Sequence, residues 1–480
     1  MVIQDIRDFI SELEKQGELK RVKTEVDSDL EIAEIMRREM YSNGPAIFFE
    51  NVKGYDMPVL GNAFGSMKRL EIGLEMTDFT EIGQRIADMT KMDMPSGLLN
   101  KIKKLPELTK MTASFPKSET SGPVTEITSS DASFDDLPIL KSWPDDAGRF
   151  ITLGLVATKH PETGVRNLGV YRMQIVDKTH ALMHWQKHKR GAHHSDISKE
   201  RGEKIPTAII IGGEPATIFS SIAPVPEGLD KYLFAGITRK EGIKTVKCKT
   251  IDLDVPANAE IVLEGYVDPA DIRDEGPFGD HTGYYTPVEP YPTFTLTGIM
   301  RRKDPIYVTT VVGKPILEDA FIGKVIERSF LPLIQMFHPE VVDFSMPAAG
   351  WFQGFAIISI KKRYPGQAKK VMMGLWGMGQ LSLTKMFVVV DEDINVHDIN
   401  DVIWAITTRA DAARDTTIIN NTPTDTLDPA SPLVNLGSKM GIDATQKTKE
   451  EGYEREIQQL VKVDDKTKDL VDSKWSSYGL

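Results

Sequence analysis

Two carboxylates flank a glycine-rich turn in the second half of the chain. Residues 273–285 read RDEGPFGDHTGYY, in which Glu275 and Asp280 lie five positions apart around Gly-Pro-Phe-Gly. The segment holds too much glycine for a helix, and glycine lets a backbone approach a ligand closely. Aromatic residues at 278, 284 and 285 are expected to exclude water. A dry setting and a second carboxylate separate two pKa values, so the pair predicts one acid and one base at neutral pH.

An arginine and an asparagine lie in a second polar segment, NLGVYRMQ at residues 167–174. Alternating apolar residues on both sides of PETG predict a hairpin, which places Arg172 on a strand. Its planar guanidinium suits a carboxylate or a phosphate, and the alternative is a structural arginine at the rim of a barrel. Asn167 offers an oxygen ligand.

A histidine-rich segment, MHWQKHKRGAHH, covers residues 183–194. Zinc binding is one interpretation, because His184 and His188 would share a helix face. The hairpin pattern instead places this segment at the end of a strand. Its basic residues favour a phosphate as the ligand, and they are Lys187, Lys189 and Arg190.

A proline-containing loop is expected at residues 220–232, SSIAPVPEGLDKY. Its backbone carbonyls could bind a hard cation, with Glu227 and Asp230 as further oxygen ligands. The alternative is an ordinary surface loop.

Motifs for nucleotide triphosphates, simple dinucleotides, esterases and zinc proteases are absent from the sequence. The residues themselves therefore favour a β-barrel enzyme in which an arginine and two acids act on an anionic substrate. A phosphorylated cofactor is expected to accompany them.

Composition narrows the class of protein. The 58 basic and 70 acidic residues give a net charge of −12, which disfavours nucleic-acid partners. The single cysteine, Cys248, permits no disulfide within the chain. The N-terminus does not resemble a signal peptide, and no apolar run is long enough for a membrane span. A cytoplasmic protein is expected, with peripheral membrane association left open.

The pattern along the chain predicts an α+β protein with several domains. Residues 1–112 mix helices and strands, and a Ser/Thr/Pro/Gly-rich stretch then marks a boundary. Residues 113–316 are rich in strands, among them AIIIGG and TVKCKTIDL, and predict a barrel or a sandwich. A linker helix at 317–338 leads to an α/β domain at 339–446. A charged helical tail at 447–480 is expected to dock on another surface, such as a second subunit.

Four long motifs together resemble the UbiD decarboxylase family. They are EGPFGDHTGYY at 275–285, NLGVYR at 167–172, VPANAEIVLEGY at 255–266 and DVIWAITTRADAARD at 401–415. The resemblance runs from RDFISELEKQGELKRV near the N-terminus to LGSKMGIDAT at 436–445. It implies a central split β-barrel, flavin-reductase-like, that binds prenylated FMN, and a C-terminal α/β domain that mediates assembly into homo-oligomers, often hexamers.

The resemblance also implies roles for individual residues. Arg172 matches the arginine that orients the substrate carboxylate, Glu275 the glutamate paired with it, and Asp280 the acid that returns a proton after carbon dioxide leaves. A neutral Asp280 in a dry pocket is therefore expected. The segments matching cofactor-binding positions comprise Val170, Tyr171, Arg172, His184, Trp185, Gln186, Lys189 and Arg190.

One position departs from the family. Asn167 matches an asparagine that binds a Mn²⁺-like ion on the flavin phosphate, and K⁺ is a second candidate cation. Family members carry a metal-binding glutamate where this chain has Lys231, which cannot ligate a cation without losing its proton. Either Asp230 or Glu227 replaces that glutamate, or the divalent site is weakened, or Lys231 neutralises the phosphate directly.

The activity implied by the resemblance is non-oxidative decarboxylation of an aromatic or α,β-unsaturated acid, served by a separate flavin prenyltransferase that supplies the cofactor. The first candidate substrate is 4-hydroxy-3-polyprenylbenzoate of ubiquinone synthesis. Anhydromevalonate phosphate and simple hydroxybenzoates are alternatives. A non-catalytic flavin-binding or scaffold subunit is the alternative outside the enzyme class.

Overall fold

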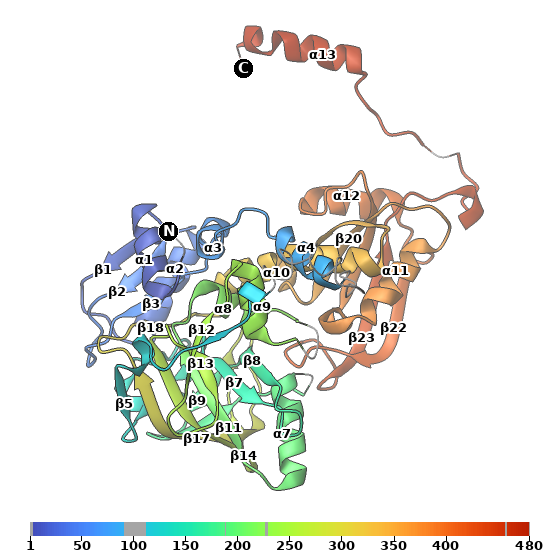
Figure 1. Ribbon diagram of the computed structural model, residues 1–480. Coiled ribbons are helices and arrows are strands. Elements are labelled where there is room, and N and C mark those ends of the chain that lie inside the picture. Colours follow the sequence, from blue (N-terminus) through green and yellow to red (C-terminus); the bar gives the residue numbers. More distant parts are fainter. Residues whose placement is uncertain (1–2, 91–111, 188, 226–228, 457, 480) are drawn as a thin grey trace, which may run out of the picture.

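The computed structural model of the chain describes residues 3–90, 112–187, 189–225, 229–456 and 458–479. Its elements form an N-terminal α/β region, a central strand-rich region and a C-terminal α/β region, drawn in blue, green and orange in Figure 1. The predicted mixed α/β architecture with several domains is confirmed.

The N-terminal region is built on a four-stranded sheet that a distant segment completes. Strand β18 (Tyr307–Val308) pairs in parallel with β3 (Val59–Gly61), so the chain returns to this sheet after the central region. Helix α1 (Ile6–Lys15) buries the apolar face that its spacing predicts. The other elements are β1 (Leu19–Val22), β2 (Ala46–Phe49), α2 (Glu31–Tyr41), α3 (Met67–Leu74) and α4 (Thr80–Thr90).

A nine-stranded sheet forms the central region, in the order β6-β9-β10-β17-β14-β11-β7-β8 with β5 paired to β17. The long strands β14 (Ile261–Glu275) and β17 (Glu289–Arg301) lie at its middle and shift register twice, which bends them. The remaining strands are β5 (Ile127–Ser129), β6 (Phe150–Ile151), β7 (Leu155–Lys159), β8 (Arg166–Val170), β9 (Met173–Ile175), β10 (His180–Met183) and β11 (Ile205–Ile211).

Short ladders and three helices complete the central region. One ladder joins β4 (Lys117–Ser118), β12 (Lys244–Lys247) and β13 (Asp254–Pro256), and a hairpin joins β15 (Phe278–Gly279) to β16 (Tyr285–Thr286). The helices are α7 (Arg190–Arg201), α8 (Pro215–Ile222) and α9 (Lys231–Arg239). The prediction that 183–194 is only a strand end is wrong in its second half, because α7 begins at Arg190.

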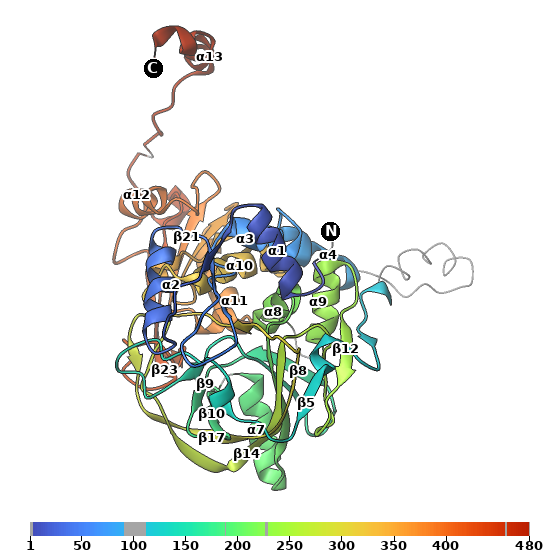
Figure 2. The same ribbon diagram turned by 90° about the vertical axis from the view of Figure 1, so that its left-hand side faces the viewer.

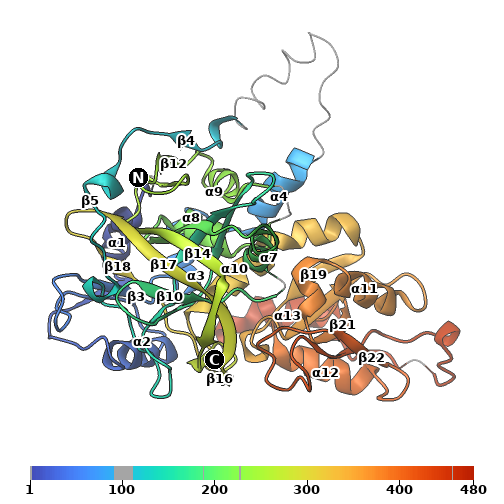
Figure 3. The same ribbon diagram turned by 90° about the horizontal axis from the view of Figure 1, so that it is seen from below.

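Helix α10 (Glu318–Phe337) spans the residues predicted for the linker helix and leads into the C-terminal region. That region holds a five-stranded sheet in the order β19-β20-β21-β23-β22. Seen from below, this sheet lies to one side of the long central strands (Figure 3). The elements are β19 (Val341–Ser345), β20 (Phe355–Ile360), α11 (Gln367–Trp376), β21 (Met386–Asp391), α12 (Ile399–Arg409), β22 (Thr416–Pro423) and β23 (Leu436–Asp443).

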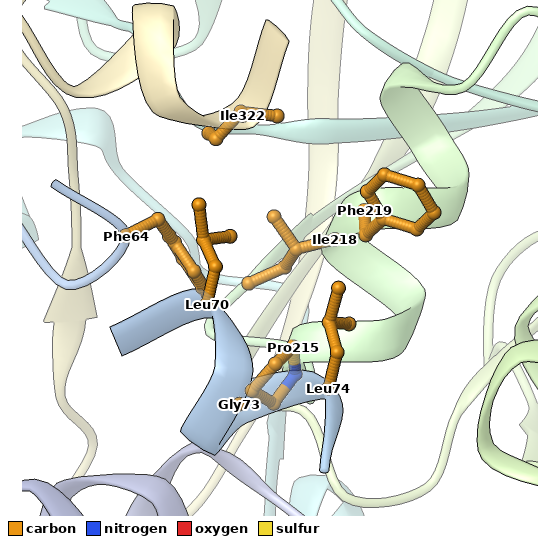
Figure 4. A pocket seen from close by; sticks show the side chains of 8 residues that line it. All are labelled: Phe64, Leu70, Gly73, Leu74, Pro215, Ile218, Phe219 and Ile322. Carbon is orange, nitrogen blue, oxygen red and sulfur yellow. The ribbon is translucent and has the colours of Figure 1, made fainter. Parts of the chain in front are cut away.

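The N-terminal and central regions meet at an apolar contact between α3, α8 and α10. Its side chains point toward a shared space (Figure 4): Phe64, Leu70, Gly73, Leu74, Pro215, Ile218, Phe219 and Ile322. The cavity there is about 10 Å³, which is room for at most one water molecule. This contact holds domains together and is too small for a substrate.

A buried glutamate at the start of α10 lies close to this contact. Glu318 is 1% exposed and its Oε1 accepts a hydrogen bond from the Phe64 amide at 2.6 Å. Burial raises the pKa of Glu318 to about 7. A raised pKa means that the contribution of Glu318 to stability is complete below the ordinary value of 4.5 and is lost as the pH rises through 7.

Glu318→Gln is expected to remove that pH dependence, because glutamine stays neutral and keeps an acceptor for Phe64. The wild-type chain should lose up to about 3 kcal/mol between pH 4.5 and 8 from this group, and the variant should not. Denaturation midpoints at pH 5 and pH 8 measure the effect, with the exposed Glu200→Gln as control. Equal pH slopes in wild type and Glu318→Gln would contradict the prediction.

A terminal helix, α13 (Asp465–Lys474), lies away from the rest of the molecule at the end of an extended segment (Figures 1 and 2). The predicted helical tail is therefore helical over only part of 447–480. None of the helices in the described residues is long and apolar enough to span a membrane.

Candidate active site

Arg172 lies between two consecutive strands, β8 and β9, which pair with different strands of the central sheet. Strand β8 pairs with β7, whereas β9 pairs with β6 and β10, and Tyr171 and Arg172 occupy the break between β8 and β9. The Arg172 side chain is buried, and its Nε and Nη2 donate to the two Glu275 oxygens at 2.7 and 2.8 Å. This bidentate pair fixes the plane of the guanidinium.

Asp280 takes the remaining side of the same guanidinium. Arg172 Nη1 donates to Asp280 Oδ2 at 2.5 Å, and Arg172 Cζ lies 4.7 Å from the centre of the Phe278 ring. Glu275 at the end of β14 and Asp280 after β15 thus converge on one buried cation. The sequence placed these three residues in one site, and the structure brings them together.

The ionisation of Asp280 differs from the expectation. Burial favours the neutral acid, but the hydrogen bond and charge of His281 and the charge of Arg172 outweigh it and hold the pKa of Asp280 well below its usual range. The predicted neutral Asp280 is therefore wrong for this arrangement of side chains, which favours the carboxylate. Sequence reasoning considered its apolar surroundings and missed the neighbouring imidazole.

His281 is the proton-bearing partner of Asp280. Its Nδ1 lies 3.0 Å from Asp280 Oδ1, and its Nε2 is buried without a hydrogen-bond partner among the described residues. Burial lowers the pKa of His281, but the hydrogen bond and charge of Asp280 raise it by a larger amount, so the net shift is upward. The ring stacks on Phe352 at 5.3 Å and faces Trp351 at 5.9 Å, both from the C-terminal region. That region therefore covers the imidazole beside Asp280.

His184 supports the other carboxylate. Its Nδ1 lies 3.2 Å from Glu275 Oε2, and its ring lies 4.3 Å from that of Tyr291. Burial and the charge of Arg172 lower the pKa of His184, so the neutral ring donates Nδ1–H to Glu275. Burial opposes ionisation of Glu275, but His184 and Arg172 together lower its pKa to about 2. Glu275 is therefore fixed as an anion.

The glycines of the loop serve close packing. A Cβ on Gly279 would lie 2.3 Å from Trp143 Cδ1, so only glycine lets Trp143 cover this turn. The prediction that three aromatics of the motif exclude water is correct for Phe278, which is 2% exposed, and wrong for Tyr284 and Tyr285, which are 65% and 41% exposed. Residues from outside the motif complete the shield, namely Trp143, Trp351 and Phe352.

A second cluster, of cations, surrounds the start of α7 and α9. Lys231 is 9% exposed and its Nζ donates to the Ser221 carbonyl at 2.7 Å. Arg190 Nη2 donates to the Val225 carbonyl at 2.5 Å, and Lys189 Nζ lies 3.3 Å from Gln380 Oε1. Burial and the charges of Arg190 and Lys189 lower the pKa of Lys231 to about 7.

The candidate metal ligands are used in other ways. Asp230 accepts hydrogen bonds from the Tyr232 and Leu233 amides as the N-cap of α9, and its Oδ2 lies 3.6 Å from Arg166. Asn167 is buried, and it lowers the pKa of the Tyr171 hydroxyl against a larger increase caused by burial. Glu227 lies outside the described residues, among which no group of three or more His, Cys, Asp or Glu could hold a metal ion. The donors that the described residues supply therefore do not fit a divalent cation.

Two buried nitrogens, one beside each cluster, could bond a polar ligand. The buried His184 Nε2 and Trp185 Nε1 have no hydrogen-bond partner in the described residues, and unsatisfied buried groups of this kind commonly face a ligand. Both belong to the predicted cofactor segment, in which Gln186 is half-buried and Val170 ends β8. Sequence reasoning missed His281, Trp351 and Phe352, and only His281 had a signal, its place directly after Asp280.

Family models match three parts of the chain. Residues 10–88 match the 3-octaprenyl-4-hydroxybenzoate carboxy-lyase N-terminal domain of UbiD, residues 116–315 its Rift-related domain and residues 320–444 its C-terminal domain. An uncharacterized protein of Archaeoglobus fulgidus is 51% identical over 99% of this chain and 98% of its own length.

Solved structures agree with these matches. Vanillic acid decarboxylase of Sedimentibacter hydroxybenzoicus in its closed form gives a TM-score of 0.88 at 28% identity, covering 100% of this chain and 99% of its own. An evolved dimeric form of the UbiD-class enzyme HmfF from Pelotomaculum thermopropionicum, in complex with prFMN, gives 0.79 at 27% identity, covering 97% and 98%.

Proposed function

Because the chain belongs to the UbiD family of decarboxylases, we propose that it removes carbon dioxide from an aromatic or α,β-unsaturated carboxylic acid with prenylated FMN as cofactor. The observation that carries the proposal is the buried Arg172 held between Glu275 and Asp280. A guanidinium fixed on one side and covered from water suits a substrate carboxylate.

The cofactor proposal rests on the segment between the two clusters. Tyr171, His184, Trp185 and Gln186 would line the flavin, and Lys189 and Arg190 its phosphate. The bent central sheet would act as a split barrel around it. Prenylated FMN would supply an electron sink for the pair left behind when carbon dioxide departs. The HmfF complex with prFMN supports this assignment.

Arg172 would bind and orient the carboxylate. Glu275 holds Nε and Nη2, which leaves Nη1 as the donor that an incoming carboxylate can take from Asp280. Orientation of this kind lowers the activation barrier, because the substrate loses its translational and rotational freedom on binding and not during the chemical step. Glu275, fixed by His184, keeps the guanidinium in place while Nη1 changes partner.

Asp280 would then receive a proton from His281. The substrate would bring a third carboxylate to one guanidinium, and the repulsion between the three anions would raise the pKa of Asp280. The proton donor is close, because His281 Nδ1 lies 3.0 Å from Asp280 Oδ1. The transfer yields the neutral aspartic acid that the substrate carbon needs as proton donor. His281 thus acts through Asp280 as a positioning and proton-supplying residue.

The substrate proposal starts from hydroxybenzoates. The family description names a hydroxybenzoate, and the similar decarboxylase acts on vanillic acid, which is also a substituted benzoic acid. We take 4-hydroxy-3-polyprenylbenzoate as the first candidate substrate. Its polyprenyl chain would bring the protein to a membrane surface as a peripheral protein. Co-expression with a flavin prenyltransferase and incubation with a panel of acids, followed by carbon dioxide release, tests the proposal. The panel includes vanillate, 4-hydroxybenzoate and anhydromevalonate phosphate, and release from none of the acids would sink it.

A homo-oligomer is proposed from the exposed apolar side chains of the tail. Leu470, Trp475 and Tyr478 are 51%, 54% and 48% exposed on and after α13, although such groups normally pack. A second copy of the chain is the proposed surface, and a hexamer is the proposed size.

Leu470→Asp with Trp475→Asp is expected to dissociate that oligomer. Burial of each side chain is worth about 1.5–3 kcal/mol, so the dissociation constant should rise more than about 100-fold. Light scattering after gel filtration measures the mass of the particle. Lys468→Glu on the same helix is the control for changed charge. An unchanged mass in the double variant would refute the role of the tail.

A further inference from the structure

Three cations near the start of α7 and α9 share only neutral partners. Lys231, Lys189 and Arg190 bond to two backbone carbonyls and one amide oxygen. Within the described part of the chain, none of them forms an ion pair within 4.0 Å, whereas most buried cations in proteins are paired. Lys231 has three N–H donors, and the Ser221 carbonyl accounts for one of them.

The first turn of α7 adds donors to the same place. The N-cap residue, Lys189, makes no side-chain cap hydrogen bond, and among the first amides of this 12-residue helix the Gly191 N–H donates to the Tyr171 hydroxyl at 3.4 Å. Trp185 is 4% exposed, and its Nε1 has no partner among the described residues. A Cβ on Gly191 would lie 2.5 Å from this nitrogen, so the indole N–H lies against the first turn of the helix.

These donors define a site for a doubly charged anion. Burial of an uncompensated charge costs free energy. A phosphate would balance the charge of the three cations and accept hydrogen bonds from Lys231 and Trp185. A divalent ion is disfavoured there, because it would add positive charge to three cations that have no carboxylate of the described residues within 4.0 Å, although Asp425 acts on Lys189 from farther away.

We propose that Lys231, with Lys189 and Arg190, binds the phosphate of the flavin directly and that this chain needs no divalent cation to hold its cofactor. The inference rests on the flavin part of the proposed function. It departs from the metal-mediated phosphate binding that the resemblance implies.

Titration of the metal-free full-length chain with FMN, followed by quenching of flavin fluorescence, tests the proposal. The dissociation constant should change by less than about twofold between EDTA and added Mn²⁺. Lys231→Met should weaken FMN binding by about tenfold or more, because it removes a charge-assisted hydrogen bond. Riboflavin, which lacks the phosphate, should bind wild type and variant alike.

Two further variants control the experiment. Lys199→Met changes an exposed lysine on the same helix α7 and should leave FMN affinity unchanged. Lys189→Met is half-buried and gives an independent test if Lys231→Met fails to fold, with the same loss for FMN and none for riboflavin. Circular dichroism checks folding in each case.

The outcomes separate the two proposals. FMN binding that requires Mn²⁺ in the wild-type chain, or FMN affinity unchanged in folded Lys231→Met and Lys189→Met, overturns direct phosphate binding and leaves the decarboxylase assignment standing. Absence of FMN binding both with EDTA and with Mn²⁺ overturns the flavin proposal itself, together with this inference.

Discussion

Asp280→Asn is expected to lower the rate of carbon dioxide release by about 10²–10⁴-fold, the usual contribution of a general acid. Asparagine keeps the size of the side chain and an oxygen that can accept from Arg172 Nη1, but it has no acidic proton. His281 would then have no carboxylate to which to pass its own proton. Product formation by the cofactor-loaded variant measures the effect.

Flavin content and thermal midpoint are the controls for Asp280→Asn. Flavin content should stay close to wild type, since Asp280 contacts Arg172 and His281 rather than the cation cluster of Lys231. The thermal midpoint should fall, because the substitution removes the charge of one partner of a buried ion pair, so the rates are compared at a temperature at which both proteins are folded. His281→Gln should instead shift the pH profile, because the raised pKa of His281 sets the pH above which the proton is lost. A rate for Asp280→Asn within about threefold of wild type would remove Asp280 from the proposed mechanism.

Arg172→Met should produce the second large effect, on both stability and activity. It leaves Glu275, which is 0% exposed, and Asp280 buried without their shared cation. Removal of one partner from a buried ion pair costs about 3–5 kcal/mol. We therefore expect a lower denaturation midpoint at pH 7 and no measurable decarboxylation.

The pH dependence of that loss has a definite sign. In the wild-type chain the pKa of Glu275 is lowered to about 2, so its contribution is complete above the ordinary value of 4.5 and is lost as the pH falls toward 2. In Arg172→Met, burial of Glu275 should favour its neutral form, so the variant should be least stable at neutral and higher pH. The difference from wild type should shrink between pH 7 and pH 4.

A double variant separates the two roles of Arg172. Arg172→Met with Glu275→Gln removes the buried anion together with its cation, so much of the stability at pH 7 should return while activity stays absent. Denaturation midpoints at pH 4 and pH 7 for wild type, single and double variants provide the test. An equal loss in Arg172→Met at both pH values would show that packing, and not charge, explains it.

The sequence predicts those elements whose periodicity reflects burial on one face. Helices α1 and α10 are examples, because a single packed face leaves a clear spacing of apolar residues. The predicted strand TVKCKTIDL is correct only for β12. Its chain turns after Lys247, because the Lys249 and Thr250 amides donate to the buried Glu264 carboxylate. A hydrogen bond to a carboxylate on another strand leaves no pattern in the local sequence.

The site likewise has features that the sequence predicts and features that it does not. Arg172, Glu275 and Asp280 were assigned through motifs, but their meeting depends on the break between β8 and β9 and on the end of β14, which no spacing along the chain reveals. The ionised state of Asp280 depends on His281. The aromatic cover comes from Trp351 and Phe352, about 70 positions later, where the sequence alone shows only a turn between two strands.

That cover has a consequence for the timing of turnover. Phe352 belongs to the C-terminal region, whereas the imidazole on which it stacks belongs to the central one. A separation of the two regions by a few ångström would hydrate His281 and weaken its electrostatic coupling to Asp280. Such a separation would therefore switch off the proposed acid, so that a proton would be delivered only while the reacting carbon is sealed from bulk solvent.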